Sequence, residues 1–183
     1  MRVDVPEGDE FVHPFAGLTQ YTPEIAAAAM QFSSAVYQHS KLPVRVLEAA
    51  RTRTAEINGC LVCQAFRSVR DLPVLYGDVS TMASNGPAPD NDFYLQVAEW
   101  RTSTLFDDRE KLAIEYAEGM GLDPIGIAAN EDFWARAKKL FTDAELADLT
   151  LSISSWVAVG RATHVLGLDT VCMVANLDQR AQV

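Results

Sequence analysis

Two cysteines, Cys60 and Cys63, are separated by two residues and directly follow Asn58 and Gly59. Side chains three residues apart on a helix lie near one face, so these sulfurs can meet, form a disulfide and be reduced again. An Asn-Gly pair typically ends a helix, which predicts that Cys60 lies in the first turn of the next helix. The free N–H groups and the positive end of the helix dipole there favour a thiolate over a thiol. The spacing therefore indicates redox chemistry at a thiol pair.

The same two cysteines have other interpretations. Free cysteine is often buried and inert, and the pair would then act as two small apolar side chains. Zinc binding would need two further ligands, for which His164 and Cys172 are the candidates. These residues lie about a hundred positions away, and their spacing is not that of a zinc finger. We therefore expect no metal at the site, and the redox chemistry requires no flavin or haem.

Composition limits the classes of protein that the sequence fits. The chain has 183 residues, of which 49% are hydrophobic and 22% charged, as expected for one globular domain. Its formal net charge of −10 argues against nucleic acid or an anionic membrane surface as a partner. No apolar run approaches the length of a membrane span, and the acidic first ten residues lack the apolar region of a signal peptide. Three cysteines make no disulfide framework, so we expect a cytoplasmic protein.

Helix signals recur along the chain, and almost no segment alternates with the period of a strand. The predicted fold class is all-α, with an N-terminal arm over residues 1–21 and one multi-helix domain over residues 22–183. The sequence has capping boxes at Asp107 with Glu110 and at Thr142 with Glu145. We expect helices over about residues 23–39, 43–58, 60–70, 91–101, 107–119, 130–140 and 143–166, with residues 71–73 ending the cysteine helix.

One further acidic residue completes a pattern around the thiols. Glu48 lies twelve residues before Cys60, and the run Arg-Thr-Arg-Thr-Ala over residues 51–55 leads towards the Cys-x-x-Cys motif. This arrangement resembles the carboxymuconolactone decarboxylase and alkylhydroperoxidase D-like superfamily, and the similarity covers most of the chain after the N-terminal arm. The resemblance implies an all-helical protomer of the alkylhydroperoxidase D-like type that forms trimers or hexamers.

The resemblance also implies a reaction. In the peroxidase branch of the superfamily, the two cysteines reduce a small hydroperoxide and an external dithiol then reduces them. By position, Cys63 would form the sulfenate, Cys60 would be its proton donor and resolving partner, and Glu48 would belong to the proton relay. Helix geometry alone instead favours Cys60 as the attacking thiol, because it lies nearest to the helix start. We follow the resemblance and take Cys63 as the attacking residue.

One position departs from the pattern of the family. Peroxidase-like members have a histidine four residues after the second cysteine, and this chain has Arg67. A guanidinium does not exchange protons near neutral pH as an imidazole does, but its charge can stabilise a thiolate one turn away. The histidines, His13, His39 and His164, are distant in sequence from the motif. We expect His164 to be structural.

Two other functions stay open. The superfamily also contains decarboxylases that act on a small lactone acid without the thiols, and such an enzyme needs a cationic pocket. Four arginines are available for it: Arg51, Arg53, Arg67 and Arg161. The third possibility is a non-catalytic helical oligomer with a residual cysteine pair. A nearly apolar last helix and an Ala-rich first helix predict a homo-oligomer in every case.

Overall fold

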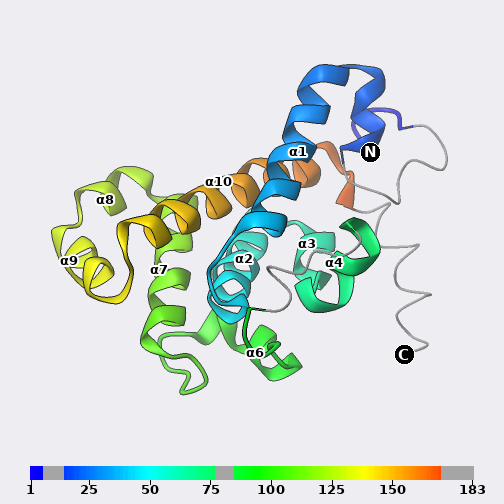
Figure 1. The fold of residues 1–183 in the computed structure, drawn as a ribbon. Coiled ribbons are helices and arrows are strands. Elements are labelled where there is room, and N and C mark those ends of the chain that lie inside the picture. Colours follow the sequence, from blue (N-terminus) through cyan, green and yellow to red (C-terminus); the bar gives the residue numbers. More distant parts are fainter. Residues whose placement is uncertain (6–14, 77–84, 170–183) are drawn as a thin grey trace.

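The computed structural model describes residues 1–5, 15–76 and 85–169, and all regular structure within these ranges is helical (Figure 1). Two short 3-10 helices, η2 (Ala16–Gln20) and η3 (Val97–Glu99), accompany the α-helices. The α-helices are α1 (Pro23–His39), α2 (Val44–Asn58), α3 (Leu61–Ala65), α4 (Ser68–Tyr76), α6 (Asn91–Gln96), α7 (Asp108–Leu122), α8 (Pro124–Ala129), α9 (Glu131–Leu140) and α10 (Asp143–Leu166). The predicted all-α class is confirmed. Within the described ranges, no helix is both long enough and apolar enough to cross a membrane.

The longest helix, α10, runs from α8 and α9 at one end of the molecule to α1 at the other (Figure 1). Helix α2 is central, because it packs against both α7 and α10. The short helices α3 and α4 follow α2 and lie beside it in Figure 1. This arrangement places the cysteine motif next to the C-terminal part of α10.

Two apolar clusters hold the helices together. The larger one joins α1, α2, α7, α9 and α10 and includes Leu47, Leu112, Phe133, Leu149 and Ile153, all of which are buried. The smaller one joins α2, α6, η3 and α7 through Ala49, Phe93, Val97, Phe106 and Ile114. Both clusters include residues of α2, so apolar packing fixes this helix on two sides.

Several helix ends lie where the local sequence predicts them. Helix α2 ends at Gly59, whose φ of 70° is the left-handed conformation that glycine adopts most easily. Both predicted capping boxes are present, at Asp107 with Glu110 and at Thr142 with Glu145. Helix α8 was not predicted, and η2 lies within the segment that we expected to be an irregular arm.

The predicted single helix over residues 60–70 is wrong. Helix α3 ends at Ala65, and the chain is extended at Phe66, with φ −67° and ψ 142°, before α4 begins at Ser68. Residues 71–73 do not end the helix either, because α4 continues through Pro73 to Tyr76.

The break between α3 and α4 has a physical cause in the side chains of α2. Arg51 donates hydrogen bonds to the carbonyl oxygens of Cys63 at 2.7 Å and Phe66 at 2.9 Å. Glu48 accepts a hydrogen bond from the backbone N–H of Ser68 at 3.3 Å. These backbone groups are satisfied by side chains of another helix, so the chain can leave the helical path without losing hydrogen bonds.

Candidate active site

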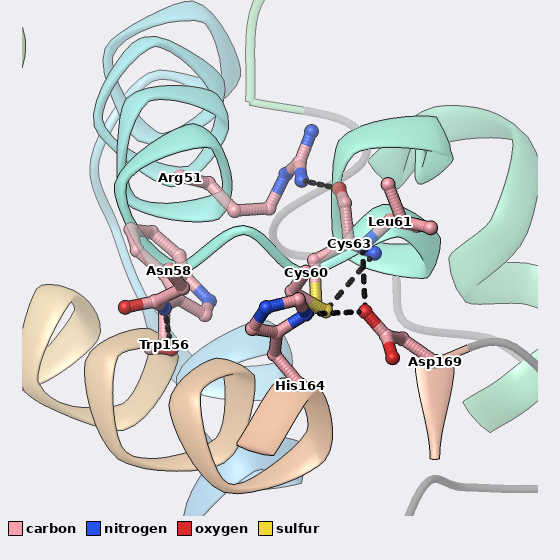
Figure 2. The surroundings of a disulfide bond; sticks show 8 residues. All are labelled: Arg51, Asn58, Cys60, Leu61, Cys63, Trp156, His164 and Asp169. Carbon is pink, nitrogen blue, oxygen red and sulfur yellow. Dashed lines mark hydrogen bonds and ion pairs between the residues drawn. A yellow bond between two sulfur atoms is a disulfide. The ribbon is translucent and has the colours of Figure 1, made fainter. Parts of the chain in front are cut away.

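The two cysteines of the motif are joined in a disulfide, with their Cα atoms 5.3 Å apart (Figure 2). Cys60 is the residue that precedes α3, and its sulfur lies 3.3 Å from the backbone N–H of Cys63, which donates to it. The spacing therefore brings the two sulfurs together as the sequence predicts, although Cys60 lies just before the first turn and not within it.

The two sulfur-bearing residues differ in exposure. Cys60 is fully buried, whereas Cys63 is partly exposed. A reagent from solvent therefore reaches Cys63 more readily than Cys60. Access from solvent bears on which cysteine reacts first, and the assignment of Cys63 as the attacking residue stays a prediction.

Glu48 is buried at the centre of a hydrogen-bond network. Its carboxylate accepts from Arg51 Nε at 2.5 Å, from Ser68 Oγ at 2.5 Å and from the Tyr94 hydroxyl at 2.6 Å. Burial disfavours the charged form, but the Arg51 charge and the hydrogen bonds from Arg51, Ser68 and Tyr94 outweigh it and lower the pKa of Glu48. Glu48 is therefore an ionised carboxylate at neutral pH.

Arg51 connects this network to the cysteine motif. Its guanidinium is buried, binds Glu48 through two nitrogens, and donates to the carbonyl oxygen of Cys63 (Figure 2). A planar guanidinium with five donors can make all of these contacts at once. Glu48 thus acts on the cysteine motif through Arg51, which fixes the backbone at Cys63.

Arg67 lies near the motif, and its guanidinium contacts backbone carbonyl oxygens and an aromatic ring. Its Nη1 donates to the carbonyl oxygens of Gln64 at 2.7 Å and Phe66 at 2.8 Å, and its guanidinium stacks 3.9 Å from the ring centre of Tyr94. Burial, followed by the charge of Arg51, lowers the pKa of Arg67. The guanidinium contributes positive charge to this region while it holds the chain between α3 and α4.

A histidine that we expected to be structural, His164, lies at the site. Asn58, at the end of α2, donates to the carbonyl oxygen of Trp156, so α10 packs directly on the start of the cysteine motif (Figure 2). About two turns further along α10, His164 lies over Gly59, where a Cβ atom would be 3.1 Å from Nε2. His164 Nδ1 is 2.9 Å from the carboxylate of Asp169.

The sequence contains only a weak signal for this arrangement. Gly167 ends α10 in the left-handed conformation, with φ 71°, and the turn that follows brings Asp169 back to His164. A histidine in the last helical turn, a glycine and an aspartate are common in any sequence. His164 and Asp169 lie close to the cysteine motif because α10 packs against α2. A short stretch of sequence does not predict this packing.

The four arginines considered for a decarboxylase have different partners in the structure. Arg51 and Arg67 meet at the carbonyl oxygen of Phe66. Arg53 instead pairs with Glu56 and Glu118. Arg161 donates to the Asn58 side chain and to the carbonyl oxygen of Gly121. Arg51 and Arg53 therefore already have carboxylate partners, whereas Arg67 and Arg161 contact uncharged oxygens.

The zinc alternative falls partly outside the described residues, because Cys172 lies there. Within residues 1–5, 15–76 and 85–169, no group of three or more histidine, cysteine, aspartate or glutamate residues is arranged to hold a metal ion. Both cysteines of the motif are bonded to each other in this structure, which leaves neither thiolate free as a ligand.

Among the comparisons with known proteins, a solved structure bears on the fold. No family model matches the chain. The uncharacterized protein YnjA of Escherichia coli (strain K12) is 43% identical over 47 residues, which cover 26% of each protein. A solved structure from Agrobacterium tumefaciens, ATU0492, is similar with a TM-score of 0.64 and 19% identity over 81% of this chain and 92% of that one. It is described as a protein of unknown function proposed to be the antioxidant defence protein AhpD. The chain thus has an AhpD-like all-helical fold.

Proposed function

We propose that the protein is a thiol-dependent hydroperoxide reductase, an antioxidant enzyme whose reacting residues are Cys60 and Cys63. The observation that carries the proposal is the bonded cysteine pair, with one sulfur buried and the other residue partly exposed. The AhpD-like fold and the similarity to ATU0492 support the same chemistry. The ion pairs of Arg53 with Glu56 and Glu118 weigh against the decarboxylase alternative.

The reaction begins with both cysteines reduced. The thiolate of Cys63 attacks the terminal oxygen of a small organic hydroperoxide, the O–O bond breaks, and the alcohol leaves with a proton. Cys63 is now a sulfenic acid. Cys60 attacks the Cys63 sulfur, the disulfide forms and water leaves. An external dithiol then returns two electrons and two protons to the pair, which fits a protein of the reducing cytoplasm.

Glu48 and Arg67 have supporting roles in this proposal. Glu48 holds Arg51 on the Cys63 carbonyl oxygen and stays a candidate for the proton relay, with the hydroxyl groups of Ser68 and Tyr94 as its neighbours. Arg67 replaces the histidine of the family pattern and adds positive charge that favours a nearby thiolate. No metal, flavin or haem is required by any of these steps.

A coupled turnover assay tests the function. Purified protein, cumene hydroperoxide and dithiothreitol should give peroxide consumption that saturates with peroxide and is absent without dithiol. Alkylation of the reduced protein with iodoacetamide should abolish it, because the thiols are the reacting groups. Turnover of a lactone acid that survives alkylation would favour the decarboxylase, and thiols that never react in the folded protein would favour a non-catalytic oligomer.

We also propose that the protein is a homo-oligomer, with a trimer or hexamer favoured by the resemblance. Large apolar side chains are exposed on α1 and α10, including Ile25 at 72%, Leu151 at 56% and Val165 at 70%. Covering apolar surface stabilises an assembly by about 25 cal/mol per Å². Light scattering at micromolar concentration should give a mass several times the 20.1 kDa of one chain. A mass near that of one chain would contradict the proposal.

A further inference from the structure

His164 and Asp169 lie close to the two chain neighbours of Cys60 and have no role in the reaction as described so far. Leu61, which follows Cys60, donates its backbone N–H to Asp169 Oδ2 at 3.1 Å. Gly59, which precedes Cys60, faces His164 Nε2, and a Cβ there would lie only 3.1 Å from that nitrogen. Figure 2 shows both side chains beside the disulfide. The residues before and after the buried Cys60 therefore face a histidine–aspartate pair.

The carboxylate of Asp169 fixes the orientation and protonation of the imidazole. Asp169 is buried, and as a carboxylate it can only accept hydrogen bonds, so His164 Nδ1 at 2.9 Å carries the hydrogen. In the neutral ring, Nε2 then has a free lone pair on the side of Gly59. The imidazole side chain is 48% exposed, so it can exchange protons with solvent.

Other charged groups near His164 have different partners or positions. Arg161, one turn earlier on α10, donates to Asn58 and to Gly121. Arg51 of α2 binds Glu48 and the Cys63 carbonyl oxygen. The amino group of Met1 lies near Gly167, beyond the end of α10. Among these groups, the imidazole has a ring nitrogen that can accept or donate a proton, and it lies over Gly59, next to Cys60.

We propose that His164, oriented by Asp169, is the acid–base group for Cys60, an inference that rests on the proposed thiol function. As Cys60 attacks the sulfenic acid of Cys63, Nε2 takes the thiol proton and supplies a proton to the departing hydroxide, so that water leaves. The imidazole, which is half-exposed, then takes up a proton from solvent. When the external dithiol attacks Cys63 as a thiolate, the S–S bond breaks and the imidazolium gives this proton to the departing Cys60 thiolate. Cys60 is buried and needs such a group, because solvent does not reach it.

The test measures a step that requires no hydroperoxide. In a Cys172→Ser background, the disulfide is reduced by dithiothreitol and the rate constant is followed across pH. His164→Gln and Asp169→Asn should each slow reduction at neutral pH by at least about tenfold and remove the imidazole titration from the pH profile. His39→Gln is the matched control, since His39 is an exposed histidine at the end of α1, and it should leave the rate unchanged.

A second readout separates an acid–base role from a structural one. With Cys60 as the only cysteine, in Cys63→Ser with Cys172→Ser, thiolate absorbance at 240 nm reports its titration without any reagent. His164→Gln should move this titration to higher pH by about one unit, because the thiolate loses its imidazolium partner. Circular dichroism checks that each variant keeps its helices.

Unchanged reduction rates and an unchanged Cys60 titration in folded His164→Gln and Asp169→Asn would overturn the inference, even if the wild-type protein consumes peroxide. Slower reduction with a shifted titration supports it. That result, in a wild-type protein that consumes no hydroperoxide, would instead refute the proposed function and leave His164 as the acid–base group of another thiol reaction.

Discussion

Replacement of Cys63 by serine is expected to lower dithiol-dependent hydroperoxide reduction by at least about a thousandfold. A serine hydroxyl is a far weaker nucleophile than a thiolate at neutral pH, and in this variant the more exposed of the two motif sulfurs is lost. The measurement is steady-state peroxide consumption with dithiothreitol as reductant. Cys172→Ser is the control and should keep the wild-type rate.

Cys60→Ser should behave differently from Cys63→Ser. Cys63 can still attack the hydroperoxide. Its sulfenic acid then has no resolving cysteine and persists until the external dithiol reduces it directly. We expect a slower but measurable turnover and a sulfenic acid on Cys63 that dimedone captures. The opposite result, in which Cys60→Ser abolishes turnover and Cys63→Ser retains it, would show that the first cysteine of the motif is the attacking one.

Replacement of Glu48 by alanine is expected to reduce the free energy of unfolding by about 3–5 kcal/mol. The change leaves the buried Arg51 guanidinium without its ion-pair partner and removes the acceptor for Ser68 and Tyr94. Urea unfolding followed by circular dichroism measures the loss. Glu115→Ala is the matched control, because Glu115 pairs with the half-exposed Arg136 and should contribute about 1 kcal/mol or less.

The effect of Glu48 should also depend on pH. Its pKa is lower in the folded protein than the ordinary value of 4.5, because Arg51 and the hydrogen bonds outweigh the effect of burial. A carboxylate with a lowered pKa stabilises the folded state above its unfolded pKa, and this stabilisation is lost as the pH falls through the folded pKa. Wild-type protein should therefore lose stability below about pH 4.5 more steeply than Glu48→Ala. Equal acid dependence in the two proteins would contradict the role of Glu48 as a buried ion-pair partner.

Features that depend on neighbouring residues could be predicted from the sequence. The end of α2 at Gly59 and the start of α10 at Thr142 follow from glycine conformation and from a capping box, and both lie where we expected them. The break between α3 and α4 could not be predicted, since it depends on Arg51 and Glu48, which reach the motif from another helix.

In the candidate site, too, some residues could be predicted from the sequence and others could not. The sequence places Cys60, Cys63 and Glu48 within one stretch; the spacing of the cysteines suggests redox chemistry, and the family resemblance adds Glu48. Tyr94 reaches Glu48 from a position 46 residues later, and His164 reaches the motif only because α10 packs on the end of α2. Such contacts come from the tertiary arrangement of helices, for which the chain has no short-range signal.

The central claim is that a hydroperoxide oxidises this cysteine pair, and a single-turnover titration tests it most directly. Reduced protein is mixed with one equivalent of cumene hydroperoxide, quenched by alkylation and analysed by peptide mass spectrometry. The account predicts one equivalent of alcohol and a peptide in which Cys60 and Cys63 are linked with the loss of two hydrogens. Thiols that both stay free, or that pass to sulfinic acid without forming the disulfide, would contradict it.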